Sequence, residues 1–235
     1  MKTLVIIPAY NEELNIPYVV DDLRKNAPFA DVLAVNDCSY DNTDAVLTEL
    51  GVNHLNLCNN LGIGGGVQAG FKYAVRNGYD ICVQFDGDGQ HDAKYIKDLI
   101  APIKNENIDM VIGSRFIDKE GFQSSVMRRV GIKFLSSLCR SFGRVDIKDV
   151  TSGFRAFSKK MFTFFAERYA QDYPEPEAVM VAGVYKAKIK EVPVEMKARR
   201  SGESSISSFG SAYYMIKVSL ALVFTRIFMD KGREI

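Results

Sequence analysis

The sequence has little excess charge of either sign and few cysteines. Its 30 Lys and Arg residues balance 29 Asp and Glu residues, which leaves a net charge of +1. No global electric field therefore favours a polyanion such as nucleic acid. The four cysteines lie far apart, without CxxC spacing, and mostly follow or lie within apolar runs. This pattern predicts reduced structural thiols in a cytosolic protein.

Long apolar runs are missing as well. The first residues show no apolar stretch with a small-residue cleavage site, as a secretory signal has, so we expect a cytoplasmic protein. From about Phe209 to Met229 the apolar residues are interrupted by Lys217 and Arg226, which excludes a continuous membrane span of about 20 apolar residues. The aromatic residues of this stretch are typical of a helix that lies on a membrane surface, docks a membrane partner or caps the core.

The sequence does contain enough apolar material for one sizeable α/β domain, with 47% hydrophobic residues in a chain of 235. Short apolar runs predict buried strands. They lie at residues 4–7, 32–35, 53–57, 81–85 and 110–113, with a later one at 189–196. Helical segments alternate with the first five, at residues 12–26, 41–50, 66–77 and 93–105. The alternation predicts right-handed βαβ units in a mainly parallel sheet with helices on both faces.

Polar residues follow three of these predicted strands. They are the segments Pro8 to Glu12, Asn36 to Ser39 and Asp86 to Gln90. In doubly wound sheets, ligands bind beyond the carboxyl ends of the strands. We therefore expect the three segments to share one site.

Asp86 and Asp88, separated by Gly87, are the most informative of these residues. Two carboxylates at this spacing can converge on one hard divalent cation, and the glycine lets a ligand approach the backbone closely. Taken alone, the run is better explained by an ordinary turn at the end of a strand. Its position beside the other polar strand ends favours a cation site that binds a phosphate.

A glycine cluster offers a competing function. Gly64 to Ala69 matches GxGxxA, and Asp86 lies about 20 residues beyond, as in the dinucleotide fingerprint of an NAD-dependent oxidoreductase. The match follows the third predicted strand and not the first, which argues against that function. The same glycines suit a helix start that faces phosphate or sugar, or a tight turn. Asp37 can accept from a nucleobase, whereas Asp41 and Thr43 fit a helix N-cap region.

Taken together, the motifs resemble those of the family 2 glycosyltransferases, and within them the dolichyl-phosphate mannose synthases and bacterial polyprenyl-phosphate glycosyltransferases. The resemblance covers roughly residues 3–206. It rests on PAYNE at 8–12, NDCSYDNT at 36–43, DGDGQH at 86–91, GSR at 113–115 and TSGFR at 151–155. It implies a nucleotide-sugar-binding, Rossmann-like fold of the glycosyltransferase A type with a DXD metal site. Asn36 and Cys38 depart from the family pattern, so the base that is recognised stays open.

The resemblance also implies roles for individual residues. The donor would contact Pro8, Ala9, Tyr10, Glu12, Asp37, Gly62, Asp86 and Gly87. The metal, Mg²⁺ or Mn²⁺, would be held by Asp86, Asp88 and Gln90. The expected catalytic residues are Asp88, Arg115 and Arg155, and the acceptor phosphate would contact Arg128, Arg129 and Ser152. A solvated helix face explains Arg128 and Arg129 about as well.

The predicted reaction is inverting transfer from a nucleotide sugar to a polyprenyl phosphate, undecaprenyl or dolichyl. A phosphate is already ionised and needs cationic positioning rather than a general base. A saccharide hydroxyl, as in cell-surface polysaccharide synthesis, would need a base. Glu175 or Glu177 could supply it, although a loop between helices explains both. A membrane-recruited, non-catalytic nucleotide-binding module is a further alternative.

We expect a catalytic domain at residues 1–208 and an amphipathic or interfacial helix at 209–235. The expected location is peripheral, at the cytoplasmic face of the cell membrane. The expected partners are a UDP- or GDP-linked sugar, a polyprenyl phosphate, and a membrane surface or small integral membrane protein. Nucleic acid is not expected, and homo-oligomerisation is left open.

Overall fold

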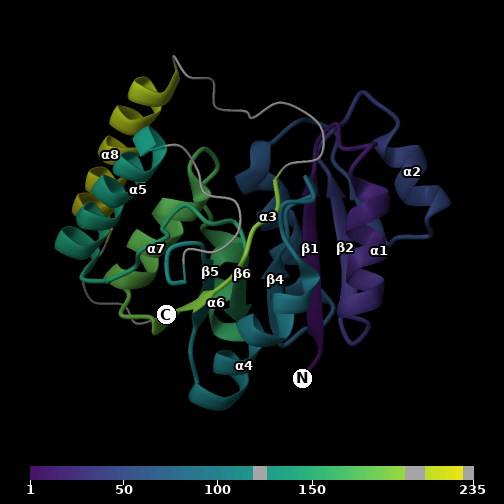
Figure 1. Cartoon of the computed structure of the whole chain (residues 1–235), viewed down its shortest axis with the longest axis horizontal. Helices are drawn as coiled ribbons and strands as arrows, with labels where there is room; N and C mark the ends of the chain where they lie inside the picture. Colours follow the sequence, from purple (N-terminus) through teal and green to yellow (C-terminus); the bar gives the residue numbers. More distant parts are fainter. Residues whose placement is uncertain (119–125, 199–209, 230–235) are drawn as a thin grey trace.

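The computed structural model of the chain describes residues 1–118, 126–198 and 210–229, without the side chains of 126–128 and 210–214 (Figure 1). Its strands are β1 (Thr3–Ala9), β2 (Asp31–Asn36), β3 (His54–Asn56), β4 (Ile81–Gln84), β5 (Met110–Ser114), β6 (Arg155–Ser158) and β7 (Ile189–Pro193). Its α-helices are α1 (Ile16–Asn26), α2 (Thr43–Glu49), α3 (Gly62–Arg76), α4 (Ile96–Glu106), α5 (Val126–Leu138), α6 (Lys159–Glu167), α7 (Pro174–Val184) and α8 (Gly210–Phe228). A 3₁₀ turn, η1 (Ala93–Tyr95), precedes α4, and a π-helical turn, η2 (Cys139–Gly143), follows α5.

The described strands form one seven-stranded sheet in the order β3-β2-β1-β4-β6-β5-β7. The pairs β1–β2, β1–β4, β2–β3 and β5–β7 are parallel. β6 runs antiparallel to both of its neighbours, β4 and β5. The predicted α/β architecture with a mainly parallel sheet is confirmed. Because β1, β2 and β4 are parallel neighbours, their carboxyl ends meet at one edge of the sheet.

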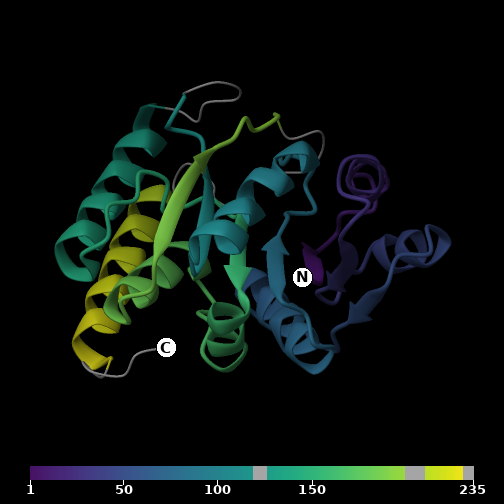
Figure 2. The same ribbon diagram turned by 90° about the horizontal axis from the view of Figure 1, so that it is seen from below.

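Side chains of β1 alternate between two hydrophobic cores, as the two-residue period of a strand requires. Leu4 and Ile6 join the core that includes residues of α3, α6 and α7. Val5 and Ile7 join the core that includes residues of α1, α2 and α4. Figure 2 shows helices on both faces of the sheet. All four side chains are fully buried, which explains why the strand is apolar throughout.

Some elements differ from the sequence expectation. β6 and α6 were not predicted, because a four-residue strand that begins with Arg155 is too short to show a strand pattern. The expectation of a loop between helices at residues 173–177 is wrong, because residues from Pro174 onward form the first turn of α7. Proline suits that position because the first helical N–H groups have no partner within the helix. The expected domain boundary at 208 and 209 lies outside the described residues.

Two helices, α5 and α8, pack side by side at the end of the molecule away from α1 and α2 (Figures 1 and 2). Gly131 of α5 permits the close approach, because a Cβ there would lie 3.0 Å from Sδ of Met215 in α8. Val218 and Leu222 of α8 are fully buried. Of the helices in the described ranges, none combines the length and the apolar character that crossing a membrane requires.

Candidate active site

The ends of β1, β2 and β4 build the candidate site. In the register of the sheet, Ala9 lies beside Asn36, and the backbone N–H of Asp37 donates to the carbonyl of Ala9 at 2.9 Å. Gly87 brings the loop after β4 against β1, since a Cβ at Gly87 would lie 3.1 Å from the carbonyl oxygen of Pro8. A larger residue would push this loop away. The polar strand ends therefore lie together, as the sequence predicted.

Asp86 is oriented by a buried histidine. The backbone N–H of Asp86 donates to Nδ1 of His91 at 3.0 Å, so the ring proton sits on Nε2, 3.5 Å from Oδ2 of Asp86. The imidazole stacks on Phe154, with 4.7 Å between ring centroids. Burial lowers the pKa of His91 to about 4. The negative charge of Asp88 works in the opposite direction and raises this pKa, whereas the positive charge of Arg115 lowers it further. A neutral histidine thus fixes the position of the Asp86 carboxylate.

Asp88 and Gln90 complete the predicted metal ligands. Asp88 is buried, and its Oδ1 accepts from the backbone N–H of Gln90 at 3.0 Å. The amide nitrogen of Gln90 donates to the carbonyl of Lys197 at 3.3 Å. The amide oxygen of Gln90 is therefore the atom that could bind a metal ion. Among the described residues, no group of three or more His, Cys, Asp or Glu could hold a metal ion. Two carboxylates and an amide oxygen still fit Mg²⁺ or Mn²⁺, which takes further ligands from substrate phosphate and water.

The loop before β6 packs directly on Asp86. A Cβ at Gly153 would lie 2.6 Å from Oδ2 of Asp86 and 3.0 Å from Oδ1, so this packing requires glycine. The loop is held from the other side by Glu191 of β7. Its two carboxylate oxygens accept from the backbone N–H groups of Lys148 and Asp149, both at 2.9 Å. Gly153 therefore limits where the Asp86 carboxylate can lie.

Arg115, which follows β5, is fixed by Asp149. Its Nε and Nη2 donate to the two carboxylate oxygens, each at 2.7 Å, and Nη2 also donates to Oγ1 of Thr151 at 3.0 Å. Burial opposes the charge of this guanidinium, but the hydrogen bonds and charge of Asp149, together with Asp86, raise the pKa of Arg115. The site thus contains a permanent, rigidly held cation that interacts electrostatically with Asp86.

Arg155 has different surroundings from those expected of a catalytic residue. Its side chain is fully buried, and its guanidinium donates to the backbone carbonyls of Ser152 at 2.7 Å, Glu175 at 2.7 Å and Val150 at 2.8 Å. Ser152 is also buried, and its hydroxyl accepts from the N–H of Phe154 at 3.3 Å. These contacts are those of a framework that joins the loop before β6 to the start of α7.

Gln84, the last residue of β4, links Asp86 to a group of polar side chains beneath it. Its amide nitrogen donates to Oδ1 of Asp86 at 3.4 Å, and its Oε1 accepts from the hydroxyl of Tyr169 at 3.5 Å. Gln84 also lies close enough to Glu175 to lower the pKa of that carboxyl. Burial raises the pKa of Glu175. The positive charge of Arg155 opposes this rise, and the negative charge of Asp86 adds to it.

The second candidate base lies elsewhere. Glu177, also in α7, accepts from the hydroxyl of Thr225 in α8 at 3.4 Å. Glu175, in contrast, interacts with Asp86 and Gln84. The structure therefore separates the two carboxylates, and Glu175 is the one near the predicted metal ligands.

The expected donor-binding residues line the same edge of the sheet. Tyr10 is exposed and meets the ring of Tyr40 edge to face, with 6.0 Å between centroids. Oε2 of Glu12 accepts from the amide of Asn15 at 2.6 Å. Asp37 is buried, and its Oδ1 accepts from the N–H of Leu61, just before α3, at 2.7 Å. Hydrogen bonds thus position both acidic side chains.

The glycine cluster belongs to α3. Gly62 begins this helix with φ at +73°, and its N–H donates to Oδ1 of Asn60 at 3.2 Å. Gly64 packs against the chain before α7, where a Cβ would lie 2.1 Å from the carbonyl oxygen of Ala170. Helix packing therefore accounts for the GxGxxA match without a dinucleotide.

The two arginines expected at the acceptor phosphate lie in α5. Arg128 lies in the first turn of α5, and its side chain is outside the described residues. Arg129 is half-buried and lines a cavity beside α5.

The sequence and fold place this chain in a family. Residues 4–165 match the model of glycosyl transferase family 2, and the chain belongs to that family. It is therefore a glycosyltransferase, with the α/β fold of the glycosyltransferase A type.

Particular relatives narrow the comparison. The chain is 35% identical to a UDP-N-acetylglucosamine–dolichyl-phosphate N-acetylglucosaminyltransferase of Methanococcus voltae, over 81% of this chain and 84% of the relative. It is 30% identical to an undecaprenyl-phosphate mannosyltransferase of Micrococcus luteus, over 88% of both chains. Glucosyl-3-phosphoglycerate synthase of Mycobacterium tuberculosis, crystallised with Mn²⁺, UDP and glucosyl-3-phosphoglycerate, shares the fold, with a TM-score of 0.73 at 18% identity over 98% of this chain and 82% of that one.

Several residues of the site were not assigned a role from the sequence, among them Gln84, His91, Asp149 and Gly153. Gln84 lies within the apolar run of a predicted strand, and Gly153 lies within the TSGFR motif at residues 151–155, so neither indicated a role of its own. His91 stood beside the two aspartates, but its burial against Phe154 depends on contacts across 63 positions of sequence. Its proximity to the carboxylates in sequence was the available signal.

Proposed function

We propose that this protein is a metal-dependent, inverting glycosyltransferase that moves a sugar from a nucleotide sugar to a polyprenyl phosphate. The observation that carries the proposal is the Asp86–Asp88 pair at the end of β4, close to the cation Arg115. Relatives that match most of the chain support the acceptor, since their names specify dolichyl phosphate and undecaprenyl phosphate.

Donor binding is assigned to the edge formed by β1, β2 and β4. The nucleotide would contact Pro8, Ala9, Tyr10, Glu12, Asp37, Gly62 and Gly87. Asp86, Asp88 and Gln90 would hold Mg²⁺ or Mn²⁺, which neutralises the diphosphate as the bond to the sugar breaks. The Mn²⁺ and UDP bound to a protein of the same fold support this assignment.

Acceptor activation follows from charge. A polyprenyl phosphate carries its own nucleophilic oxygen anion, so the protein has to position it rather than deprotonate it. Arg115, held by Asp149, offers a fixed positive charge for the donor or acceptor phosphate, and Arg128 and Arg129 are further candidates. Attack on the face of the sugar opposite the diphosphate inverts the anomeric carbon. Arg155 and Ser152 are assigned to the framework around the site.

A saccharide hydroxyl is the second candidate acceptor. The position of Glu175 favours it, because this carboxyl lies near Asp86 and burial raises its pKa. A hydroxyl nucleophile would need such a base, whereas a phosphate would not. Glu175→Gln consequently distinguishes the two. We expect transfer to polyprenyl phosphate to persist within a few-fold in this variant, with Glu177→Gln as the matched control.

The direct test uses purified protein, Mn²⁺ or Mg²⁺, a panel of UDP- and GDP-linked sugars, and undecaprenyl or dolichyl phosphate in detergent. We expect a lipid-linked sugar whose formation stops on chelation of the metal. Asp88→Ala is expected to lower turnover by about 100-fold or more while the protein remains folded. Metal-dependent turnover within a few-fold of wild type in this variant would remove Asp88 from the metal site. Tight nucleotide binding without turnover would favour a non-catalytic module.

The proposed location follows from the acceptor. A polyprenyl chain keeps its phosphate at a membrane surface, and nucleotide sugars are cytoplasmic. We therefore propose a peripheral protein at the cytoplasmic face of the membrane, which meets its acceptor either directly at the lipid surface or through an integral membrane partner.

A further inference from the structure

The outer face of α8 carries a stripe of exposed apolar side chains. Ile216, Leu220, Phe224 and Phe228 are spaced four residues apart, so they lie along one side of the helix, and each is more than half exposed. The rings of Phe224 and Phe228 stack, with centroids 5.9 Å apart. The opposite side of α8 is buried against the rest of the protein. α8 is thus bound to the fold by one side and presents apolar residues on the other.

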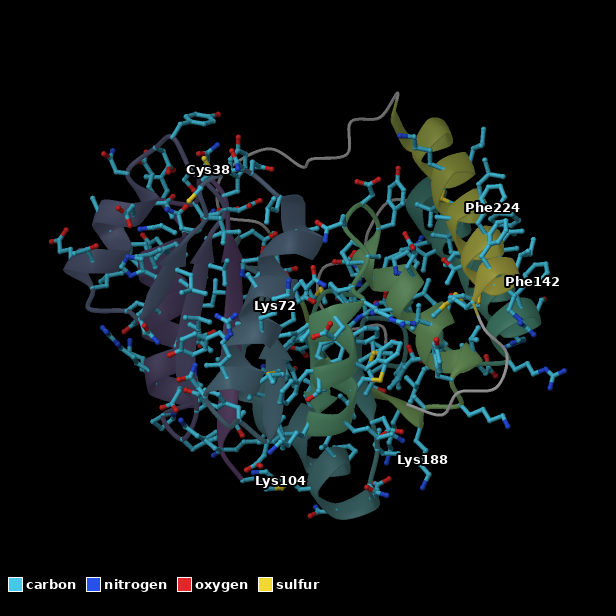
Figure 3. All side chains as sticks on the ribbon, turned by 180° about the vertical axis from the view of Figure 1, so that it is seen from behind. Cys38, Lys72, Lys104, Phe142, Lys188 and Phe224 are labelled. Atoms are coloured by element: carbon cyan, nitrogen blue, oxygen red, sulfur yellow. The ribbon has the colours of Figure 1, made fainter. Side chains whose placement is uncertain are left out.

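Exposed apolar side chains also lie on α5 and η2, which both pack against α8. Val130 and Phe134 are exposed on one side of α5, and Phe142 is exposed in η2. The Nε of Arg226 in α8 donates to the carbonyl of Phe142 at 2.8 Å, which ties η2 to α8. Figure 3 shows Phe142 and Phe224 along the same outer edge of the molecule. Exposed apolar residues of this number in one region mark an interaction surface.

Positive charge borders this apolar surface. A cavity of about 680 Å³ lies beside α5, and its lining includes four cationic residues and one acidic residue, Asp146. The cationic residues are Arg129, Lys133, Arg140 and Lys148. Asp146 is itself paired with Arg140. On α5, Arg129 and Lys133 each precede an exposed apolar residue by one position, so the cationic and apolar sides of this helix adjoin.

We infer that the surface formed by α8, η2 and the exposed side of α5 docks on an anionic lipid bilayer. The apolar side chains would enter the boundary between headgroups and acyl chains, and the lysines and arginines would contact anionic headgroups. A second copy of the chain fits less well. A symmetric interface would place this cationic border against itself or leave it unpaired, whereas an anionic bilayer complements it.

Vesicle binding tests the inference without donor or acceptor, so its outcome is independent of the proposed reaction. The full chain is mixed with vesicles of phosphatidylcholine alone, or of phosphatidylcholine with about one third phosphatidylglycerol, and sedimented. We expect binding to the anionic vesicles that weakens strongly in high salt, and about tenfold weaker binding to the neutral ones. Equal binding to both, or no binding to either, would overturn the inference.

Two variants and two matched controls locate the surface. Phe224→Ser with Phe228→Ser is expected to weaken binding about tenfold by removing apolar anchors, and Lys133→Glu to do the same through charge. The controls are Tyr18→Ser on α1, an exposed aromatic, and Lys72→Glu on α3, which lies away from α8 in Figure 3. If the controls weaken binding as much as the variants, the surface is wrongly placed.

Two further measurements complete the test. Circular dichroism confirms that the double variant is folded, and transfer to a detergent-solubilised acceptor should be unchanged in it. Sedimentation velocity measures the oligomeric state. A wild-type dimer that the double variant disrupts, together with vesicle binding that the variant leaves intact, would assign the surface to a second copy and overturn the bilayer proposal.

Discussion

At the scale of single residues, the position of Asp86 depends on neighbours that carry no charge at neutral pH. His91 orients its carboxylate, Gln84 donates to it, and Gly153 packs against it. A metal ligand must be held within fractions of an ångström to act in catalysis. The residues that limit its motion therefore matter as much as the ligand itself.

The first prediction concerns Gly153. In Gly153→Ala the new methyl group would lie 2.6 Å from Oδ2 of Asp86, so the carboxylate or the loop must move. We expect turnover to fall about 100-fold, as misplacement by about 1 Å produces, with a higher metal concentration needed for half-maximal rate. Gly66→Ala is the control, since its new Cβ meets only ordinary contacts. Unchanged metal dependence in Gly153→Ala would show that the loop yields freely.

The second prediction separates a structural from a chemical role for Arg155. Lysine also has three N–H donors, but its compact ammonium cannot place them where the forked guanidinium reaches the carbonyls of Val150, Ser152 and Glu175. Arg155→Lys should therefore lose about 3 kcal/mol of unfolding free energy, measured with urea, as for other broken buried charge networks. If the variant is as stable as wild type but inactive, Arg155 contacts the substrate after all.

The third prediction is a pH dependence of stability. Glu175 has a raised pKa, so the folded state binds its proton more tightly than the unfolded state does. Its ionised form therefore costs stability at pH values above the raised pKa, and the cost vanishes as pH falls below the ordinary carboxyl range. Glu175→Gln removes the charge. We expect a higher Tm than wild type at pH 7.5 and no difference at pH 4, measured by thermal unfolding. A lower Tm at pH 7.5 would contradict this account.

At this scale the sequence identifies charged residues better than the neutral residues that position them. Asp86 and Asp88 were found because two carboxylates at the end of a strand have a recognisable chemistry. Arg155 was expected to contact substrate because arginine binds phosphate, yet its burial is set by β6 and α7, which lie 20 positions apart. Such packing depends on tertiary contacts that no local pattern reports.

At the scale of elements, α3 shows how a glycine cluster can serve packing. Its residues 64–66 are all glycine and all buried, and their neighbours differ. Gly64 meets the backbone of 170–171, whereas Gly66 has Pro8 and Val35 at ordinary contact distances. Helix propensity favours alanine over glycine at both positions by about 1 kcal/mol.

The fourth prediction uses this pair. Gly66→Ala should leave stability unchanged or raise it by up to about 1 kcal/mol. Gly64→Ala should lower it by about 2 kcal/mol, because the methyl group would overlap the carbonyl of Ala170. Urea unfolding of the two variants provides the comparison. Equal effects would mean that the 170–171 segment moves aside without cost.

Elements with a clear period were predictable, and short ones were not. The strands β1, β2, β4 and β5 are apolar runs buried on both faces, which makes them visible in sequence. β6 has four residues and lies antiparallel between β4 and β5, so its place depends on partners distant in sequence. The loop that precedes β6 nevertheless packs against Asp86 through Gly153.

At the scale of the whole molecule, the candidate active site and the exposed apolar surface lie in different places. The carboxylates and Arg115 lie at the carboxyl edge of the sheet, whereas the apolar surface of α5, η2 and α8 lies at one end of the fold (Figure 1). The family and the fold of this chain are established by the comparisons. The identity of the acceptor is the feature of the proposed function that still has to be tested. A protein that works on a lipid phosphate needs both parts at once.

One measurement tests this central claim most directly. Wild-type protein is incubated with Mn²⁺, a panel of nucleotide sugars, and polyprenyl phosphate beside a set of saccharide acceptors, and the glycosylated products are identified. We predict a polyprenyl-phosphate sugar of inverted anomeric configuration, whose formation stops on chelation of the metal and falls by about 100-fold or more in Asp88→Ala. Transfer to a saccharide hydroxyl alone, lost in Glu175→Gln, would contradict the account.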